Sequence, residues 1–374
     1  MRRIALRSIL FDRGKLIASL LGVALASTLG FVQIGLYRGF EQSSSTVIDH
    51  LGGDMWAMPS GLDVIDYSEI VSVGPRNLLL SHSCVADVRA VLYGFAFVRR
   101  PNGTHSTALV VAVEPRPGMQ LPWGEVAGDR AELDDPLRIS VDRTDLAKLE
   151  LPADPIGSSF EINGRTVTVA VATNGIRSFT LNPYMFTSTT NARRLLNVGE
   201  NSAMYYVVDL ADKNCGADLV AWMKRQPDIQ LLDTEAWSKK TQAFWVSGSG
   251  AGAALLFTAV LGLFVGGVIV GQTLYSMTKE HLLELATLKA VGARPSELAG
   301  FVLWQVAFLA AVGVVSGFTL ALVLKRVLEN AGLTVVVSPE TVGLSVLATV
   351  LMCAFASVTS LLAVFKLEAA TVLR

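Results

Sequence analysis

The sequence predicts an α-helical membrane protein with four transmembrane helices in a 1 + 3 arrangement and a large α+β extracytoplasmic domain between the first and second helices. Two observations lead to this fold class. Only 17% of the 374 residues are charged and 51% are hydrophobic, whereas soluble domains carry about a quarter charged residues. The charge deficit is concentrated in four windows that contain no Asp, Glu, Lys, Arg or His.

The four windows cover residues 16–37, 241–278, 298–324 and 341–365. A helix needs about 20 mainly apolar residues to cross a hydrocarbon core of about 30 Å, and all four windows reach that length. Helix is the expected conformation because lipid offers no hydrogen-bond partners to an open backbone. The second window exceeds one span, so we expect one helix over 233–278 that forms a stalk. The small residues at 247–252 are the place where it could kink or break.

The first window has a second interpretation. Basic residues precede it, and the Val-Ala-Leu-Ala sequence at 23–26 ends like a signal-peptidase site. A cleaved signal peptide is therefore the alternative to a membrane anchor. The apolar run continues to Tyr37, which is long for the hydrophobic region of a signal peptide and favours a span.

Lysine and arginine decide the predicted orientation. Residues 1–15 carry five basic residues against one acid, the 279–297 connection holds three basic residues, and the 366–374 tail holds two. By the positive-inside rule these segments are cytoplasmic, with 1–15 as an amphipathic lead-in on the inner leaflet. Both termini are then cytoplasmic, and residues 38–240 and the short 325–340 loop lie outside.

The 38–240 segment is long enough for a folded domain of mixed α and β structure. An Asn-Gly pair between β-branched flanks predicts a hairpin over 160–169. Cys84 and Cys215 either form a disulfide in an oxidising compartment or remain two buried thiols. Further strands are expected at 106–113, 203–210 and 229–232, and a helix at 217–225. Proline and glycine between about 115 and 157 indicate loops or a subdomain boundary.

Motifs for the common catalytic and coupling chemistries are missing from the sequence. No GxxxxGK[ST] loop for nucleotide phosphates, no HExxH and no GxSxG elbow occurs, and the four histidines are too dispersed for a metal site. The spans hold no ionisable residue, which argues against a proton- or sodium-driven carrier. We therefore expect no catalytic residue, metal or cofactor in this chain, and an energy source outside it.

Small residues recur every four positions in three of the windows. Such stripes let helix backbones approach closely in lipid, either between two subunits or between helices of one chain, and the sequence leaves both interpretations open. The residues are Ala18, Gly22, Ala26 and Gly30 in the first span, Gly262, Gly266, Gly267 and Gly271 in the second, and Gly313 and Gly317 in the third.

The 279–297 connection is richer than a simple linker. Leu282, Leu285, Ala286 and Lys289 fall at helical spacing, and Gly292 followed by Pro and Ser predicts that one helix stops and another starts. An amphipathic helix along the inner face suits insertion of an apolar ridge into the groove of a partner protein. A helix that merely rests on lipid is the alternative.

Residues 283–298 resemble the coupling-helix motif of FtsX/MacB-type ABC permeases, which commonly reads R-E-I-G-x-x-x-A-x-G-A. Two positions depart from that motif, since Leu283 replaces the usual Arg and Ala286 the usual Gly. The matching positions are Glu284, Ala290, Gly292 and Ala293.

Within this superfamily the chain is most similar to DevC-like permeases. The similarity lies in Val-Ile-Val-Gly-Gln-Thr-Leu-Tyr at 268–275 and His-Leu-Leu-Glu-Leu-Ala-Thr-Leu-Lys-Ala at 281–290. Leu-Gly-Gly-Asp-Met-Trp at 51–56 also stands where such proteins enter their outer domain. The motif is specific over about 265–300, the topology matches over the whole chain, and the outer domain matches weakly.

The resemblance implies a permease subunit in the bacterial inner membrane that works as a dimer with a separate ABC ATPase, which binds ATP and Mg²⁺. It further implies a periplasmic adaptor, an outer-membrane duct and export of lipid-like or other amphiphilic cargo, and no nucleic acid. The second span would carry nucleotide-driven motion to the periplasmic domain. The ATPase would dock on His281, Leu282, Glu284, Leu285, Ala286, Leu288, Lys289, Ala290, Gly292 and Ala293.

Three other functions are compatible with the same motif and topology. An FtsX-like regulator would activate a cell-wall hydrolase through its outer domain. LolC- and LolE-like chains extract lipoproteins through a groove accessible to lipid. A membrane enzyme is the weakest of the three, because the sequence holds no catalytic constellation.

The predicted orientation can be tested with reporters. A reporter fused after Arg374 should be active only in the cytoplasm, and one inserted near Asn102 only outside it. Activity measured with compartment-specific reporters checks both positions, and any other pattern contradicts the four-span topology.

Overall fold

The computed structural model describes residues 13–366, which fall into two compact units. The membrane unit holds the four long apolar helices, and the sheet unit holds Phe40–Ala251 together with Gly332–Thr334. Most of the predicted 1–15 lead-in and nearly all of the 366–374 tail lie outside the described residues.

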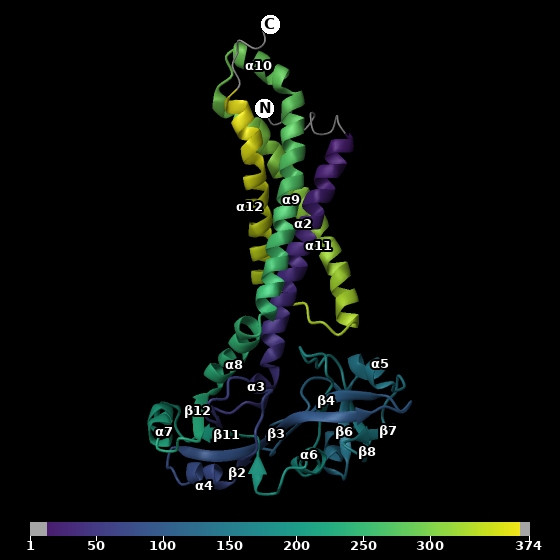
Figure 1. Cartoon of the computed structure of the whole chain (residues 1–374), viewed down its shortest axis with the longest axis vertical. Coiled ribbons are helices and arrows are strands. Elements are labelled where there is room, and N and C mark those ends of the chain that lie inside the picture. The colour runs from purple at the N-terminus through teal and green to yellow at the C-terminus, as the bar shows by residue number, and fades with distance from the viewer. Residues whose placement is uncertain (1–12, 367–374) are drawn as a thin grey trace. The chain divides into compact units, whose positions relative to one another are not determined.

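The membrane unit confirms the 1 + 3 arrangement. Its helices, each long and apolar enough to cross a membrane, are α2 (Arg13–Ser44), α9 (Ala251–Glu280), α11 (Pro295–Asn330) and α12 (Pro339–Phe365). They run alongside one another in Figure 1. Helices α2 and α11 extend at both ends beyond the charge-free windows that predict them, because charged and polar residues continue the helix outside the apolar span. Helix α12 begins just before its window, whereas α9 begins only at Ala251, inside the 241–278 window.

A short helix, α10 (Leu282–Ala290), lies between α9 and α11. The predicted stop and restart is confirmed, since Gly292 has a φ of +106° and α11 begins at Pro295. Glycine adopts this left-handed conformation without steric cost, and proline is favoured at the first helical position. The Glu297 carboxylate accepts the backbone N–H of Arg294 at 2.8 Å and caps the new helix.

The sheet unit contains one large mixed sheet and a two-stranded one. The large sheet has the order β12-β1-β11-β3-β7-β8-β5, with β4 beside β3 and β9, and β6 beside β8. Its strands are β1 (Met55–Pro59), β3 (Val85–Arg99), β4 (His105–Val113), β5 (Val126–Ala127), β6 (Arg138–Asp142), β7 (Ser159–Ile162), β8 (Arg165–Thr173), β9 (Tyr184–Phe186), β11 (Tyr205–Leu210) and β12 (Ile229–Asp233). The small sheet pairs β2 (Val71–Ser72) with β10 (Ser202–Ala203).

Short helices cover this sheet. The α-helices are α3 (Thr46–Leu51), α4 (Gly74–Leu80), α5 (Leu146–Leu149), α6 (Thr189–Leu196), α7 (Gly216–Met223) and α8 (Thr234–Ala243). Three 3₁₀ turns cover Arg130–Asp134, Arg143–Asp145 and Lys213–Cys215, and a π-helix covers Phe244–Gly248.

Both faces of the sheet are buried where β1 and β11 lie. Alternate residues enter different cores: Trp56 and Tyr205 join one core with Trp237 of α8, while Met55 and Tyr206 join the other core. Successive side chains of a strand point to opposite faces. A strand buried on both faces therefore shows a continuous apolar run rather than an alternation.

Most elements predicted in the outer domain are confirmed. The Asn163-Gly164 turn has φ values of +48° and +76°, as a two-residue hairpin turn requires, and joins β7 to β8. The strands at 106–113, 203–210 and 229–232 and the helix at 217–225 correspond to β4, β11, β12 and α7. The long β3 escaped prediction because charged residues and Gly94 interrupt its apolar pattern.

The expected continuous helix over 233–278 is interrupted. Between α8 and α9 the chain forms the π-helix, and Gly250 adopts a φ of +76°, which ends the helical path. The small, glycine-rich stretch lacks the side chains that would stabilise a helix there, and glycine reaches the left-handed region freely.

The two alternatives for Cys84 and Cys215 are resolved. They form a disulfide with a Cα–Cα distance of 6.0 Å, joining the start of β3 to the start of α7 across 131 residues of sequence. Cys353 in α12 remains a free, buried thiol.

Replacing both cysteines by serine should lower the free energy of unfolding of the sheet unit by about 2–4 kcal/mol, because the unfolded chain regains a long open loop. Thermal unfolding of the purified full-length protein, with and without reductant, measures this. Wild type in reductant should behave like the double variant, and an unchanged unfolding temperature in both cases contradicts a structural role for the disulfide.

Candidate functional site

The glycine stripes of the first two spans face each other within this chain. A Cβ added at Gly266 would lie 2.1 Å from the Ala26 Cβ, and one at Gly22 would lie 2.8 Å from Ile269. Real side-chain carbons do not approach so closely, so a Cβ at Gly266 would push against Ala26, and one at Gly22 would require the Ile269 side chain to shift. Of the remaining stripe positions, Gly262 lies against Leu29, Gly30 lies more loosely against Leu263, and Ala18 is exposed.

The third span packs on the opposite side of the same α2 helix. A Cβ at Gly313 would meet Val23 at 2.2 Å, and one at Gly317 would meet the Ala24 carbonyl oxygen at 2.9 Å. Thr28 donates its hydroxyl to the carbonyls of Ala24 at 2.7 Å and Gly317 at 3.2 Å. Apart from the exposed Ala18, the stripe residues of α2, α9 and α11 therefore pack inside one chain.

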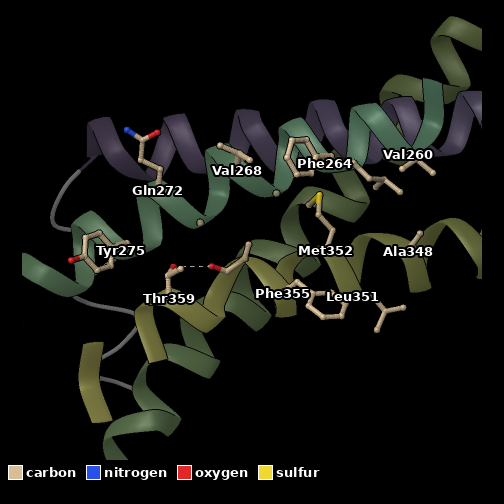
Figure 2. Close-up of a pocket in the computed structure, with 14 residues that line it drawn as sticks. Val260, Phe264, Val268, Gln272, Tyr275, Ala348, Leu351, Met352, Phe355 and Thr359 are labelled. Atoms are coloured by element: carbon tan, nitrogen blue, oxygen red, sulfur yellow. Dashed lines mark hydrogen bonds between the residues drawn. The ribbon is translucent and has the colours of Figure 1, made fainter. Parts of the chain in front are cut away.

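Gly267 and Gly271 face α12 instead, and they form the floor of a groove. Their added Cβ atoms would lie 3.3 Å from Met352 and 3.1 Å from the Ala356 carbonyl oxygen. The groove has a volume of about 810 Å³ and is open on one side. Figure 2 shows Val260 and Leu351 at one of its ends and Tyr275 and Thr359 at the other.

The 279–297 connection, which contains α10, lies at the end of the bundle where α9 stops. Leu285 and Ala286 are each only 2% exposed and pack into the core of the membrane unit with Leu298 and Phe301 of α11. The expectation that they form a ridge for a partner protein is therefore wrong. These side chains attach α10 to its own bundle, since an apolar residue beside a helical core buries its surface there first.

The outward face of α10 consists of other residues. Leu283 is 66% exposed and Val291 84%, and with Thr287 between them they form a stripe at four-residue spacing. The Glu284 side chain is 72% exposed and lies 3.0 Å from His281 Nδ1. Ala290 and Gly292 are also exposed, whereas Leu282, Leu288, Lys289 and Ala293 are half-buried.

The α8 helix and the π-helix after it are fastened to the sheet unit by polar bonds. Lys240 Nζ donates to the Leu62 carbonyl at 2.7 Å and lies 3.0 Å from the Asp63 carboxylate. Gln242 donates to Ser45 Oγ at 2.8 Å. The segment is therefore held to a loop of the sheet unit and to the residue that follows the first long helix.

A buried carboxylate holds the π-helix itself. Asp66 accepts the Trp245 indole N–H at 3.0 Å and the Tyr93 hydroxyl of β3 at 2.7 Å. Burial raises the pKa of Asp66 above its ordinary value, and the two hydrogen bonds partly oppose that shift. Rings continue the contact, since Phe179 packs on Trp245 and Tyr67 on Phe244 with centroids 4.7 and 5.6 Å apart.

Residues 256–369 match the family model described as the FtsX-like permease C-terminal domain. The matched segment begins within α9 and contains α10, α11 and α12. This part of the chain carries the sequence signature of an FtsX-like permease domain. The match includes α10 and most or all of the three C-terminal membrane-spanning helices. The FtsX-like segment is therefore a multi-pass membrane domain.

Solved structures resemble the chain over about half its length. The periplasmic region of MacB from Actinobacillus actinomycetemcomitans aligns with a TM-score of 0.37 and 12% identity, over 50% of this chain and 91% of that one. The extracellular domain of the noncanonic ABC-type transporter YknZ from Gram-positive bacteria aligns with a TM-score of 0.34 and 10% identity, over 48% and 98%. No curated protein matches the chain.

Two features of the FtsX-like segment escaped sequence reasoning. The motif does not predict the outward stripe of α10, because Leu283 stands where the motif has Arg and the matching positions are its neighbours. The groove was missed because lipid-facing apolar residues look alike in sequence, and only the pairing of α9 with α12 brings Phe264 and Phe355 to one surface. Among residues 13–366, no group of His, Cys, Asp and Glu is suited to hold a metal ion.

Replacing Gly317 by Ala should destabilise the membrane unit by about 1–3 kcal/mol, because the new methyl group meets backbone that cannot yield. The matched control is Gly343→Ala in α12, where an added Cβ meets nothing within 4 Å. That control should be neutral or slightly stabilising, since alanine favours helix over glycine. Thermal unfolding in detergent compares the two, and equal effects contradict the tight α2–α11 contact.

Proposed function

We propose that this chain is the permease subunit of an ABC transporter. A separate ATPase docks on α10, and its ATP-driven motion passes through α9 to the sheet unit. The observation that carries the proposal is the exposed stripe of Leu283, Thr287 and Val291 on a helix that leads directly from a transmembrane helix, within a segment matching an FtsX-like permease domain.

The two faces of α10 suit this role. The outward face offers exposed apolar side chains and the Glu284 carboxylate to a partner groove, the usual means by which an amphipathic helix is recognised. The inward face buries Leu285 and Ala286 in the bundle core. A force applied to α10 therefore acts on α9 and α11 rather than displacing a loose loop.

The route to the sheet unit runs along α9. This helix has 30 residues and a length of about 45 Å. Only Ser249 and Gly250 separate it from the π-helix, which Asp66 and the neighbouring rings hold to the sheet unit. A displacement of α9 is then passed to α8 and to the loop at 62–67.

The finer features of the proposal rest on the resemblance to DevC-like permeases. They are a dimer of two permease chains in the bacterial inner membrane, a periplasmic adaptor, an outer-membrane duct and lipid-like or other amphiphilic cargo. The absence of ionisable residues from the spans supports a transporter driven by an external ATPase, because ion-coupled carriers use such residues. ATP and Mg²⁺ would bind to the partner ATPase.

Affinity purification of the detergent-solubilised protein separates the candidate functions. An ATPase that copurifies with an adaptor supports the exporter, and an ATPase with a cell-wall hydrolase supports an FtsX-like regulator. Copurification of lipoproteins favours LolC/LolE-like extraction. Absence of any ATPase contradicts docking through α10.

Two substitutions on the outward face of α10 test docking. Glu284→Lys and Leu283→Asp should each abolish stimulation of the partner ATPase, because they place a wrong charge on an exposed docking surface. Both variants should fold normally, as judged by their unfolding temperature in detergent. ATPase activity is measured in the reconstituted complex, and unchanged stimulation in both variants contradicts docking through this face.

Two further variants control that experiment. Glu340→Lys reverses an exposed charge in the first turn of α12, at the opposite end of the membrane unit, and should leave ATPase stimulation unchanged. Leu285→Asp should instead destabilise the protein by at least about 2 kcal/mol, because it buries an unpaired charge. Its loss of activity would therefore coincide with loss of folded protein, unlike that of Glu284→Lys.

A further inference from the structure

We propose that the groove between α9 and α12 is a binding site for an anionic glycerophospholipid. The acyl chain lies along the apolar part of the groove, and the phosphate lies beside Lys279 and Lys366 at the end nearest α10. The groove is lined by α9 and α12 and not by α10, and lipid binding there goes beyond the proposed transport function.

The apolar part of the groove is suited to an acyl chain. Its floor is low because Gly267 and Gly271 carry no side chains, and its walls are large exposed residues such as Phe264 and Phe355, which are 66% and 75% exposed. From Val260 to Tyr275 the groove runs for about 22 Å along α9. This exceeds the roughly 15 Å of hydrocarbon in one leaflet and leaves length for the ester region of a lipid.

The polarity of the groove changes along its length. Its polar lining side chains, Gln272, Tyr275 and Thr359, gather at the end nearest α10, whereas Val260 and Ala348 line the other end (Figure 2). An amide and two hydroxyl groups can donate hydrogen bonds to ester and phosphate oxygens. A lipid has this same gradient from chain to headgroup.

Two lysines continue the polar end. The helices run parallel, with Gly267 against Met352 and, one turn further on each, Gly271 against Ala356. Two more turns bring Lys279 level with the residues just before Lys366. Lys279 lies four residues after Tyr275, and Lys366 lies seven after Thr359, so helical periodicity places both on the faces that line the groove.

The charges at this end favour an anionic headgroup. Lys279 and Lys366 are exposed, and neither forms an ion pair within residues 13–366. Among the described residues, two nearby acids are engaged elsewhere, since Glu280 pairs with Lys15 and Glu284 with His281. A phosphate supplies the missing negative charge, whereas a transmembrane helix of a second copy would cover two lysines with an apolar surface.

Photocrosslinking of the full-length protein in nanodiscs tests the site. The probe is phosphatidylglycerol with a diazirine on its acyl chain, compared with the same photoreactive phosphatidylcholine. We expect adducts concentrated on Phe264, Val268 and Phe355, and several-fold more of them with phosphatidylglycerol. Adducts spread evenly over the lipid-facing surface, including the α11 face at Val315, or equal yields with both lipids, would overturn the proposal.

Matched variants separate headgroup from chain recognition. Lys279→Gln combined with Lys366→Gln should reduce groove adducts by about tenfold or more, because each lysine near an anionic headgroup contributes severalfold to affinity. Arg326→Gln, which removes an exposed charge from the far end of α11, should have no effect. Ala348→Trp should fill the groove and abolish its adducts, whereas Val315→Trp on the exposed face of α11 should not.

An introduced thiol tests the competing occupant. The native cysteines are a disulfide pair and one buried thiol, so Phe355→Cys adds an accessible one. We expect the introduced thiol to react with a soluble maleimide only after lipid is stripped by detergent, and not to crosslink to a second chain. Efficient crosslinking of two Phe355→Cys chains through this thiol in nanodiscs would assign the groove to a second copy and overturn the lipid site.

Discussion

The close approach of α2 to its neighbours is the contact on which the rest of the membrane unit depends. In lipid there is no hydrophobic force to bring helices together, so packing and interhelical hydrogen bonds must do it. Gly266 against Ala26 and Gly317 against the Ala24 carbonyl permit that packing. Thr28 to Gly317, and Ser27 to Thr349 of α12 at 3.3 Å, add polar contacts. With α2 between α9 and α11, Gly22, Gly266, Gly313 and Gly317 pack inside the chain, whereas the groove between α9 and α12 is open on one side.

The sheet unit is stabilised by a different force. It buries large aromatic side chains such as Trp56 and Trp237 away from water, on a sheet with cores on both faces. The buried hydrogen bonds of the sheet unit hold particular elements in place and contribute less than apolar burial to its free energy of unfolding. Asp66 joins β3 to the π-helix through Tyr93 and Trp245, so a residue of the central sheet and the segment leading to α9 share one carboxylate. A buried carboxylate with two partners specifies one arrangement, because losing either partner leaves its oxygen unsatisfied.

The α10 helix and the groove lie at the same end of the membrane unit, and this has a mechanical consequence. Leu285 and Ala286 attach α10 to α11, while Lys15 and Glu280 join the ends of α2 and α9. A lipid headgroup at Lys279 and Lys366 would add a link between α9 and α12 there. Protein docking on α10 and lipid binding in the groove would then act on the same helices. If both favour the same arrangement of α9, each would strengthen the other.

The sequence by itself determined the membrane class, the 1 + 3 order of spans, the Asn163-Gly164 hairpin and the Gly292–Pro295 break, because composition over 20 residues and local turn chemistry act without distant partners. Tertiary structure alone decided which face of α10 looks outward. Leu285 and Leu283 are equally apolar in sequence, but only the position of α11 buries one and exposes the other. The same holds for the disulfide, the Asp66–Trp245 bond and the groove, whose residues lie far apart in the chain and meet only after packing. Helical spacing in the sequence shows that α10 has two faces. Which of them is buried depends on a neighbouring helix, whose position the local sequence does not determine.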